Sequence, residues 1–502
     1  MALKRKNSKM RSITRARTSQ NRKIVSNKQA PIDPHREEDE EDGFSLKTSA
    51  HSNNHGVQPL GNLYLSPTSH NSRDAGLGNL HVLTDELVIE ILGFLDGSHL
   101  GVLATVSKSF YIFCSHEPLW RTLALEKLNG GFLYTRSWRT TYIAAHYPGF
   151  AVSRIGLSGL AIRDFYSDFL FQSWLCASLE MKSDWLKRDN IPRRRGISVE
   201  EFVLNFEEPN KPVLLEGCLM KWVAMKKWDR DYLVATCGDI KFSVGPVEMK
   251  IEDYFRYSDQ AREERPLYLF DPKFAKKVPI LGLEYDVPVY FRDDLFYVLG
   301  DERPDYRWII IGPAGSGSSF HVDPNSTSAW NAVIKGSKKW VLFPPDVIPP
   351  GVHPSPDGVE VACPVSIIEW FMNFYAATKD WKKKPIECIC KAGEVIFVPH
   401  GWWHLVINLE ESIAITQNYV SRRNLLNVLD FLKKPNASEL VSGTKDRVNL
   451  HDKFQKAIEA SFPGIIEGQL MRKVTEKKAQ QPRLSFWESV TDTNAGAFKF
   501  SF

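Results

Sequence analysis

Residues 393–408 read GEVIFVPHGWWHLVIN, and this stretch decides the fold. Its first apolar run predicts a strand over Glu394 to Val398, and Pro399 with Gly401 predicts a tight turn. The apolar run after the turn predicts a returning strand that opens with His404. His400 lies inside the turn, where no strand fixes its direction, so we assign it to the rim. The stretch therefore places His404 at the start of a strand, directly after a turn.

A second stretch supplies two more candidate metal ligands. His321 and Asp323 are separated by one residue, and residues i and i+2 of a strand point to the same face, so both can reach one ion. Two imidazoles and one carboxylate leave three positions of an octahedron open, as non-haem iron(II) oxygenases require. We therefore predict that His321, Asp323 and His404 are the metal ligands and the catalytic centre. The alternative is a barrel with structural histidines and no metal.

The region around these residues is similar to a known family. Residues 393–408 fit the cupin pattern G-x5-P-x-G-x2-H-x3-N at every fixed position. Further matching segments are PLYLFD (266–271), FRDDLF (291–296), RPDYRWIIIGP (303–313), GSSFHVDPNSTSAWNAVIKGSKKWVLFPP (317–345) and VPHGWWHLVINLEESIAITQNYV (398–420). Over residues 196–436 the chain resembles the Jumonji-C branch typified by the bifunctional arginine demethylase and lysyl hydroxylase. The resemblance implies a double-stranded β-helix, in which two antiparallel sheets close on a site at one mouth.

The same resemblance implies a site for 2-oxoglutarate as cosubstrate. Lys338, 17 residues after the first histidine ligand, would pair with the distal carboxylate, and Thr416, 12 residues after the last ligand, would add a hydroxyl. The further residues that match this site are Ser318, Asn331 and Tyr268. A carboxylate inside a barrel needs a paired cation and hydrogen bonds to offset its desolvation. The neighbouring Lys335 and Lys339 are expected in solvent, on a turn or on the opposite strand face.

Residues 83–110 read LTDELVIEILGFLDGSHLGVLATVSKSF, and EPLW follows at 117–120. The residues at helical spacing are Leu83, Leu87, Val88, Ile91, Leu92 and Leu95. Thr84, followed by two acids, predicts a helix N-cap. Over residues 78–128 the chain resembles an F-box, in which a proline commonly takes the place of Thr84. The resemblance implies an Skp-type adaptor of a cullin–RING ubiquitin ligase as partner; a helical hairpin that packs only within the chain is the alternative.

The charge of the chain is unevenly distributed. Residues 1–28 hold ten Lys or Arg and no acid, so the rest of this +4 chain sums to −6 (+4 less +10). Residues 1–76 are poor in large apolar side chains and are predicted to be disordered. Residues 4–6 (KRK) predict a nuclear-localisation signal or a nucleic-acid contact, with a solvated tail as the alternative. We expect a nuclear location, or otherwise a cytoplasmic one, and nucleic-acid binding only through this tail.

The remaining segments complete an α+β organisation, a cupin-like barrel with an amino-terminal F-box and flanking helices. Residues 129–195 predict a helical support, and residues 437–502 predict a carboxy-terminal helical tail. No run of 18 or more apolar residues occurs, which argues against a membrane span. The seven cysteines contain no CxxC pair and are expected to be reduced, with Cys388 and Cys390 on one face of a strand.

The activity that follows from the resemblance is oxidation of a protein side chain. With iron(II), 2-oxoglutarate and dioxygen, such an enzyme would hydroxylate or demethylate Lys or Arg residues, and the acidic body favours a basic protein substrate. The presence of all three ligands together with Lys338 and Thr416 favours catalysis. The alternatives are a non-catalytic F-box substrate receptor that uses the barrel for binding, and an oxygenase that acts on RNA or a small molecule.

Overall fold

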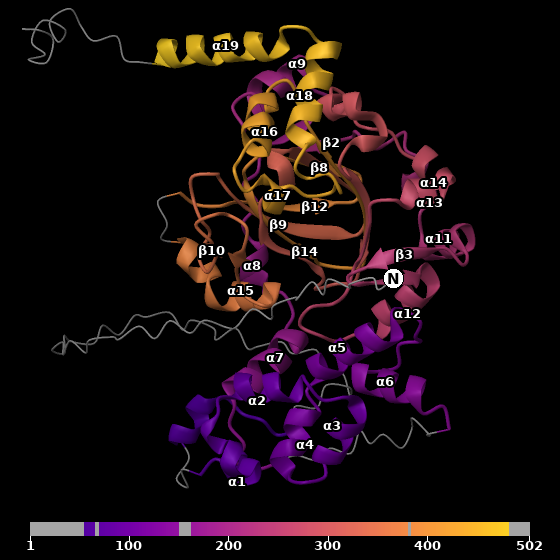
Figure 1. Ribbon diagram of the computed structural model, residues 1–502, viewed down its shortest axis with the longest axis vertical. Helices are drawn as coiled ribbons and strands as arrows, with labels where there is room; N and C mark the ends of the chain where they lie inside the picture. The colour runs from indigo at the N-terminus through magenta and orange to yellow at the C-terminus, as the bar shows by residue number, and fades with distance from the viewer. Residues whose placement is uncertain (1–54, 66–69, 150–161, 380–382, 481–502) are drawn as a thin grey trace, which may run out of the picture.

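The computed structural model describes residues 55–65, 70–149, 162–379 and 383–480. A helical amino-terminal module lies at one end, a β-sandwich occupies the middle, and carboxy-terminal helices cover the other end (Figure 1). This arrangement confirms the expected α+β class with a cupin-like barrel. None of the helices in the described ranges is long and apolar enough to cross a membrane.

The amino-terminal module consists of short helices with polar caps. They are η1 (Leu60–Leu65), α1 (Ser72–Leu77), η2 (Gly78–Val82), α2 (Asp85–Leu92), α3 (Gly97–Leu103), α4 (Lys108–Cys114), α5 (Glu117–Leu128), α6 (Trp138–His146), α7 (Asp168–Ser178) and α8 (Ser183–Leu186). As predicted, Thr84 caps α2, because its side chain accepts a hydrogen bond from the backbone N–H of Leu87. Asp96, Ser107 and Ser167 cap α3, α4 and α7 in the same way. Each cap gives a partner to a backbone N–H group that the helix itself leaves unpaired.

Only part of the expected apolar stripe of α2 enters the core. Val88 and Leu92 are buried, whereas Leu87 and Ile91 are 46% and 44% exposed. Phe94, just after the helix, is 84% exposed. Helix α2 therefore packs one apolar face inward and leaves a second one on the surface.

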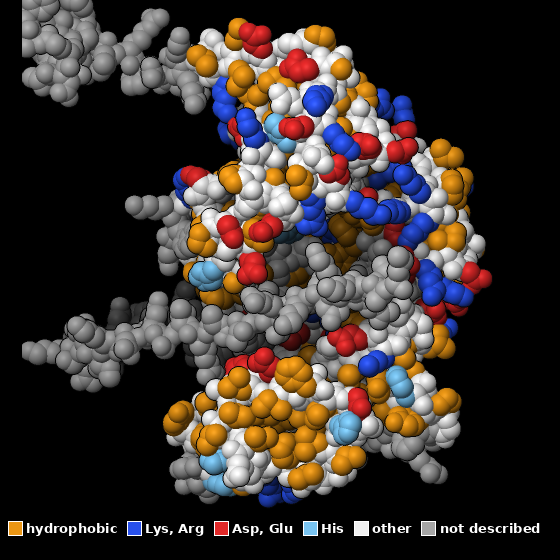
Figure 2. Space-filling model, viewed as in Figure 1, with side chains coloured by type: hydrophobic (Ala, Val, Ile, Leu, Met, Phe, Trp, Pro, Cys, Tyr) orange, Lys and Arg blue, Asp and Glu red, His pale blue; other side chains and the backbone are white. Residues whose placement is uncertain are grey.

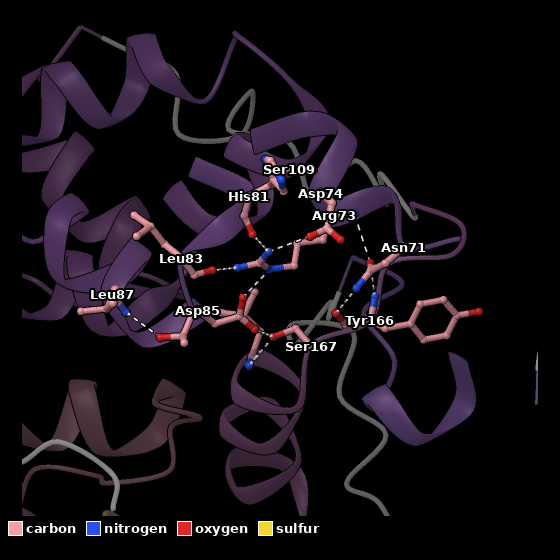
Figure 3. A network of polar contacts seen from close by, with 12 residues as sticks. Asn71, Arg73, Asp74, His81, Leu83, Asp85, Leu87, Ser109, Tyr166 and Ser167 are labelled. Carbon is pink, nitrogen blue, oxygen red and sulfur yellow. Dashed lines mark hydrogen bonds and ion pairs between the residues drawn. The ribbon is translucent and has the colours of Figure 1, made fainter. Parts of the chain in front are cut away.

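Arg73 joins the residues before α2 to the rest of the module (Figure 3). Its guanidinium forms an ion pair of 2.6 Å with Asp85 and donates to the carbonyl oxygens of His81 and Leu83. Asp85 also accepts a hydrogen bond of 2.5 Å from the hydroxyl of Ser167, at the start of α7. The expectation of disorder up to residue 76 is therefore wrong for residues 55–65 and 70–76, since buried contacts hold helix α1. The rest of the expected tail, residues 1–54 and 66–69, lies outside the described residues.

Two sheets form the sandwich. The large sheet has the order β1-β2-β13-β8-β15-β6-β5-β3-β4, and the small sheet has the order β12-β9-β14-β7. The strands of the large sheet are β1 (Arg193–Arg195), β2 (Val213–Glu216), β3 (Lys241–Val244), β4 (Val247–Lys250), β5 (Leu269–Asp271), β6 (Arg307–Gly312), β8 (Ser328–Lys335), β13 (Glu394–Val398) and β15 (Ser412–Tyr419). Those of the small sheet are β7 (Gly317–His321), β9 (Ser337–Phe343), β12 (Ile386–Lys391) and β14 (Trp403–Asn408). A short pair, β10 (His353–Pro354) and β11 (Val361–Ala362), lies apart from both sheets.

Helices surround the sandwich on its outer faces (Figure 1). Those between the strands are α9 (Val199–Phe202), α10 (Ala224–Lys227), α11 (Arg230–Cys237), α12 (Ile251–Gln260), α13 (Phe274–Lys277), α14 (Pro279–Leu283) and α15 (Ile367–Asn373). Those after the last strand are α16 (Leu425–Leu432), α17 (Ala437–Leu440), α18 (Leu450–Ser461) and α19 (Ile465–Gln480). The helical texture expected after residue 436 is confirmed up to residue 480, and residues 481–502 lie outside the described ranges.

The space between the sheets is apolar along one edge. Side chains of both sheets meet there in one buried cluster that includes Leu214, Ile396, Trp340, Cys388 and Cys390. The two cysteines share one face of β12, as predicted. This packing holds the sheets together at β2, β13, β9 and β12, and it leaves the opposite edge, at β7, β15, β6 and β5, available for polar residues.

Lys339 contradicts the expectation of a solvated side chain. It is 0% exposed, forms an ion pair of 2.8 Å with Glu387 on β12, and donates to the carbonyl oxygen of Arg188. The side chains of Arg188 and Tyr375 donate to the same Glu387 carboxylate. Lys339 does lie on the strand face opposite to Lys338, but other parts of the chain cover that face. Lys335 is exposed, as expected.

Candidate active site

His321, Asp323 and His404 converge at one end of the small sheet. Strand β7 ends at His321, the turn after β13 leads into β14, and His321 and His404 are partners across the β7–β14 pair. Their ring centroids are 4.1 Å apart. One ligand atom from each of the three residues lies within 4.8 Å of the others. The strand, turn and returning strand expected from residues 393–408 therefore bring the three side chains around one point.

Both imidazoles are oriented by backbone carbonyl groups. Nδ1 of His321 lies 2.8 Å from the carbonyl oxygen of Ser319, and Nδ1 of His404 lies 3.1 Å from that of Trp402. Because a carbonyl oxygen can only accept a hydrogen bond, each Nδ1 carries a proton, which leaves Nε2 as the atom that can bind a metal. Burial and the neighbouring His321 also hold the pKa of His404 well below its ordinary value, so the ring is neutral. Two imidazoles whose Nδ1 atoms are held by carbonyl groups can present their Nε2 atoms to a metal ion.

Asp323 supplies the negative charge of the cluster. Burial raises the pKa of Asp323 above its ordinary value, while His321 and a hydrogen bond with Asn418 lower it. Its Oδ2 atom has no hydrogen-bond partner among the described residues. A buried carboxylate oxygen without a partner is costly unless a cation lies beside it. The set of two nitrogens and one oxygen therefore fits iron(II), which would occupy the common point of the three side chains.

Lys338 lies on the inner face of β9 with its ammonium group buried. Its Nζ donates a hydrogen bond of 2.7 Å to Oδ1 of Asn408, whose Nδ2 donates to Oγ of Ser316 at 2.9 Å. Burial lowers the pKa of Lys338 to about 8. A side chain at Gly312 would collide with this group, since its Cβ would lie 2.3 Å from Ser316 Oγ and 2.7 Å from Asn408 Nδ2. Lys338 is thus a buried cation held by an amide oxygen rather than by a carboxylate.

The other expected site residues line the same polar side of the sandwich. Thr416, Asn331 and Trp308 are register partners across β8, β15 and β6, so their side chains share one face. Oδ1 of Asn331 is buried and has no hydrogen-bond partner among the described residues. The hydroxyl groups of Tyr268 and Ser318 share a hydrogen bond of 2.8 Å, which joins the start of β5 in the large sheet to β7 in the small sheet. The structure therefore gathers all eight expected site residues around the space between the two sheets.

Sequence reasoning left some residues of this site without a role. Asn408 is a fixed position of the cupin pattern, and that signal was available for its contact with Lys338. The contacts of Asn418 and Ser316 depend on strands that are distant in sequence, and no local pattern marks them. His400 stays outside the cluster as expected, and burial lowers its pKa to about 4.

Comparison with known proteins places this geometry in a family. A cupin-like domain model matches residues 199–424, and an F-box-like model matches residues 85–126. The bifunctional arginine demethylase and lysyl-hydroxylase psr-1 of Caenorhabditis elegans is 40% identical, over 47% of this chain and 63% of that protein. The 2-oxoglutarate and iron-dependent oxygenase JMJD4 of Homo sapiens is 30% identical, over 48% of this chain and 63% of that protein. The chain belongs to the Jumonji-C, cupin-like family of iron(II)- and 2-oxoglutarate-dependent oxygenases.

Within this family one similarity extends over nearly the whole chain. The arginine-specific demethylase JMJ22 of Arabidopsis thaliana is 74% identical over 462 residues, which are 92% of this chain and 91% of that protein. The aligned length is too great for the cupin-like domain alone, so it also includes flanking helical parts. The family resemblance and the enzyme class expected from the sequence are therefore confirmed.

Proposed function

We propose that this oxygenase acts on arginine or lysine side chains of basic proteins, with removal of a methyl group from N-methylarginine as the favoured reaction. The observation that carries the proposal is the complete cluster of two imidazoles and one carboxylate within 4.8 Å, in a chain 74% identical to an arginine-specific demethylase. A non-catalytic barrel would have no need to keep all three side chains oriented around one point.

In this proposal the iron ligands are His321, Asp323 and His404. Bound iron(II) and 2-oxoglutarate would supply, with dioxygen, the oxidation of a substrate C–H bond. An N-methyl carbon that gains a hydroxyl would leave its nitrogen as formaldehyde, and the hydroxyl proton would move to the nitrogen. The carbonyl groups of Ser319 and Trp402 hold both Nδ1 atoms, so the two Nε2 atoms would be the ones to bind the ion. The protein thereby fixes the orientation of the two imidazole rings relative to the rest of the site.

The proposed 2-oxoglutarate site is the polar group on the inner strands. The Lys338 ammonium would pair with the distal carboxylate, and the hydroxyl of Thr416 would donate to the same group. The residues that would complete this site are Tyr268, Ser318 and Asn331. The support is physical: among the described residues the buried Lys338 ammonium has an amide oxygen and no carboxylate as partner, so a ligand carboxylate would give it a charge partner.

The reaction can be tested with purified full-length protein, iron(II), ascorbate and 2-oxoglutarate. Peptides of one Arg/Lys-rich sequence would carry unmodified arginine, N-methylarginine, lysine or N-methyl-lysine, and an acidic peptide would serve as control. We expect succinate release with the methylarginine peptide and a mass loss of one methylene. A gain of one oxygen would assign hydroxylation, and succinate release that is equal with every peptide would refute a protein substrate.

We also propose that the F-box-like module docks an Skp-type adaptor of a cullin–RING ubiquitin ligase. Figure 2 shows hydrophobic side chains gathered on the outer surface of this module. The large apolar side chains exposed there are Leu87, Ile91, Phe94, Val102 and Val106, with exposures between 44% and 84%. An exposed apolar patch of this kind marks a protein interface. The module would thus link the oxygenase, or its bound substrate, to a ligase.

Finally, we propose a nuclear location directed by the basic residues 1–28. The support is compositional, because ten basic residues and no acid occupy this segment. Imaging of a fluorescent fusion with and without residues 1–28 tests the proposal. Unchanged nuclear signal after the deletion would assign the address to another segment, and a cytoplasmic full-length protein would refute it.

A further inference from the structure

Two aromatic side chains form a stacked pair at the open edge of the sandwich. The rings of Phe270, on β5, and Trp308, on β6, have centroids 5.3 Å apart and planes 17° apart. Tyr268 contacts Phe270 edge to face, with centroids 5.9 Å apart. The pair belongs to the inner face of the large sheet, because Trp308 is the register partner of Thr416 and Phe270 that of Ile310.

The exposure of this pair differs from that of the tryptophans in the apolar cluster at the closed edge. Trp340 and Trp402 are 4% and 7% exposed, whereas Phe270 is 36% exposed and Trp308 is half-buried. On β15 only Thr416, beside Trp308, is partly exposed, and the other seven residues are buried. Solvent therefore reaches the inner face of the sheet at Thr416, Trp308 and Phe270, where a bound substrate would enter.

We infer that Phe270 and Trp308 form a platform for the cationic side chain of the substrate, and that this cation is a methylated guanidinium group. The inference rests on the proposed function and names the substrate class of the same site. The electron-rich face of an aromatic ring attracts a cation within about 6 Å, and tryptophan does so best. Because the two rings are stacked, each has one face against the other and keeps its opposite face for a ligand, and a planar guanidinium can cover such a face.

The shape of the platform also separates guanidinium from ammonium groups. A trimethylated ammonium group is round, and it is bound best where several rings surround it. Phe270 and Trp308 lie in one stack, so they cover one side of a ligand only. The methyl group of a guanidinium lying on this surface would remain in its plane, free to point towards the cluster of His321, Asp323 and His404.

The test measures peptide binding without turnover, in full-length protein with 2-oxoglutarate and no added iron. Labelled peptides of one sequence carry N-methylarginine, citrulline or trimethyl-lysine, and anisotropy gives each Kd. Citrulline has the shape of arginine but no charge. Phe270→Leu removes the aromatic face and keeps most of the apolar volume, and Phe94→Leu is the matched control on the distant F-box surface.

We expect the wild-type protein to bind methylarginine more tightly than citrulline or trimethyl-lysine. Phe270→Leu should weaken methylarginine binding about fivefold and Trp308→Leu about tenfold, while citrulline binding changes less. Phe94→Leu should change none of the three constants. Circular dichroism and thermal unfolding establish that each variant is folded.

Three outcomes would overturn the platform. They are unchanged methylarginine binding in both folded variants, equal weakening for citrulline and methylarginine, and tighter binding of trimethyl-lysine than of methylarginine by the wild-type protein. Failure of the proposed function is recognised separately. In that case the wild-type protein would show the predicted binding order and ring dependence but no methyl loss from the peptide when iron is added.

Discussion

The barrel and the amino-terminal module depart from the usual distribution of side chains in opposite directions. The barrel buries charge, with Lys338 3% exposed and an Asp323 oxygen for which the described residues offer no hydrogen-bond partner. The F-box-like module exposes apolar groups, with Phe94 84% and Val102 68% exposed. Both arrangements cost stability in an isolated protein. Each is understandable if a partner completes it, a cation and a carboxylate in the barrel and an apolar protein surface on the module.

Lys339 is a buried charge that already has a partner of opposite charge in the chain. Lys339 is as deeply buried as Lys338, yet it has Glu387 as partner at 2.8 Å. Within the described parts of the chain, the partner of Lys338 is the amide oxygen of Asn408 and no carboxylate. Burial alone therefore does not indicate a site on this strand. The indication comes from burial without a charge partner, which distinguishes a ligand-binding lysine from a structural one.

The largest expected effect comes from removing the charge at the centre of the barrel. Asp323→Ala should abolish bound iron and lower 2-oxoglutarate turnover by at least about a hundredfold, because two neutral imidazoles alone hold iron(II) weakly. Metal analysis of the purified variant measures the first effect, and succinate release measures the second. His400→Ala is the control, since this neighbouring histidine lies outside the cluster. Full iron content in Asp323→Ala would remove Asp323 from the ligand set.

Charges placed on the exposed apolar surface of the F-box-like module should prevent it from docking its partner. Leu87→Asp combined with Phe94→Asp should abolish co-purification with an Skp-type adaptor, because two carboxylates would have to lose water in the interface. Turnover of 2-oxoglutarate should not change, since both side chains are exposed and lie outside the buried cluster that the module shares with the large sheet. Val88→Asp is unsuitable for this purpose, because that side chain is 1% exposed and its substitution would unfold the module. If adaptor binding survives the double change, the exposed patch serves another partner.

Substitutions of the two neighbouring lysines, Lys338 and Lys339, should affect different properties of the protein, cosubstrate affinity and stability. Lys339→Ala leaves the Glu387 carboxylate buried with Arg188 and Tyr375 but without its ammonium partner. We expect a loss of about 3 kcal/mol in the free energy of unfolding, at the lower end of the range for broken buried pairs. Denaturant titration followed by circular dichroism measures it. Lys335→Ala, at an exposed position of β8, should leave stability unchanged, and an equal loss in both variants would disprove the structural role of the Lys339 pair.

Lys338→Ala should act on cosubstrate affinity instead. Loss of the charge-assisted hydrogen bond to a carboxylate should raise the KM for 2-oxoglutarate about tenfold or more, with bound iron unchanged. Kinetic titration with 2-oxoglutarate measures the effect, and Lys335→Ala again serves as control. An unchanged KM would assign the distal carboxylate to another residue.

The smallest expected effect is a pH dependence of the same interaction. Burial lowers the pKa of Lys338 to about 8 in the protein without cosubstrate. Below this pH the lysine is charged and attracts a carboxylate, and above it the free protein must first take up a proton. The KM for 2-oxoglutarate should therefore rise as the pH increases from 7 to 9, by up to about tenfold for each pH unit above the pKa. Lys338→Ala should lose this dependence, and a flat KM profile in the wild-type protein would contradict it.

The sequence by itself determined the parts of this protein that depend on neighbouring residues. The two-residue spacing brought His321, the last residue of β7, and Asp323, just beyond the strand, to one site. The Pro/Gly turn placed His404, and Thr84 capped α2 as predicted. The positions of Cys388 and Cys390 followed from strand alternation. These features depend on backbone geometry over a few residues, which composition and spacing express directly.

Only the tertiary structure decided which side chains are buried, which are exposed and which partners they contact. Strand alternation put Lys339 on the outer face of β9, but Glu387 and residues 188–190 turn that face into the interior. The stack of Phe270 on Trp308 requires β5 to pair with β6, and the register of that pair is set by strands far away in the chain. The helical spacing of α2 gave its apolar positions, whereas packing against other helices left Leu87 and Ile91 outside. Burial and charge pairing arise from contacts between distant segments, so no local pattern contains them.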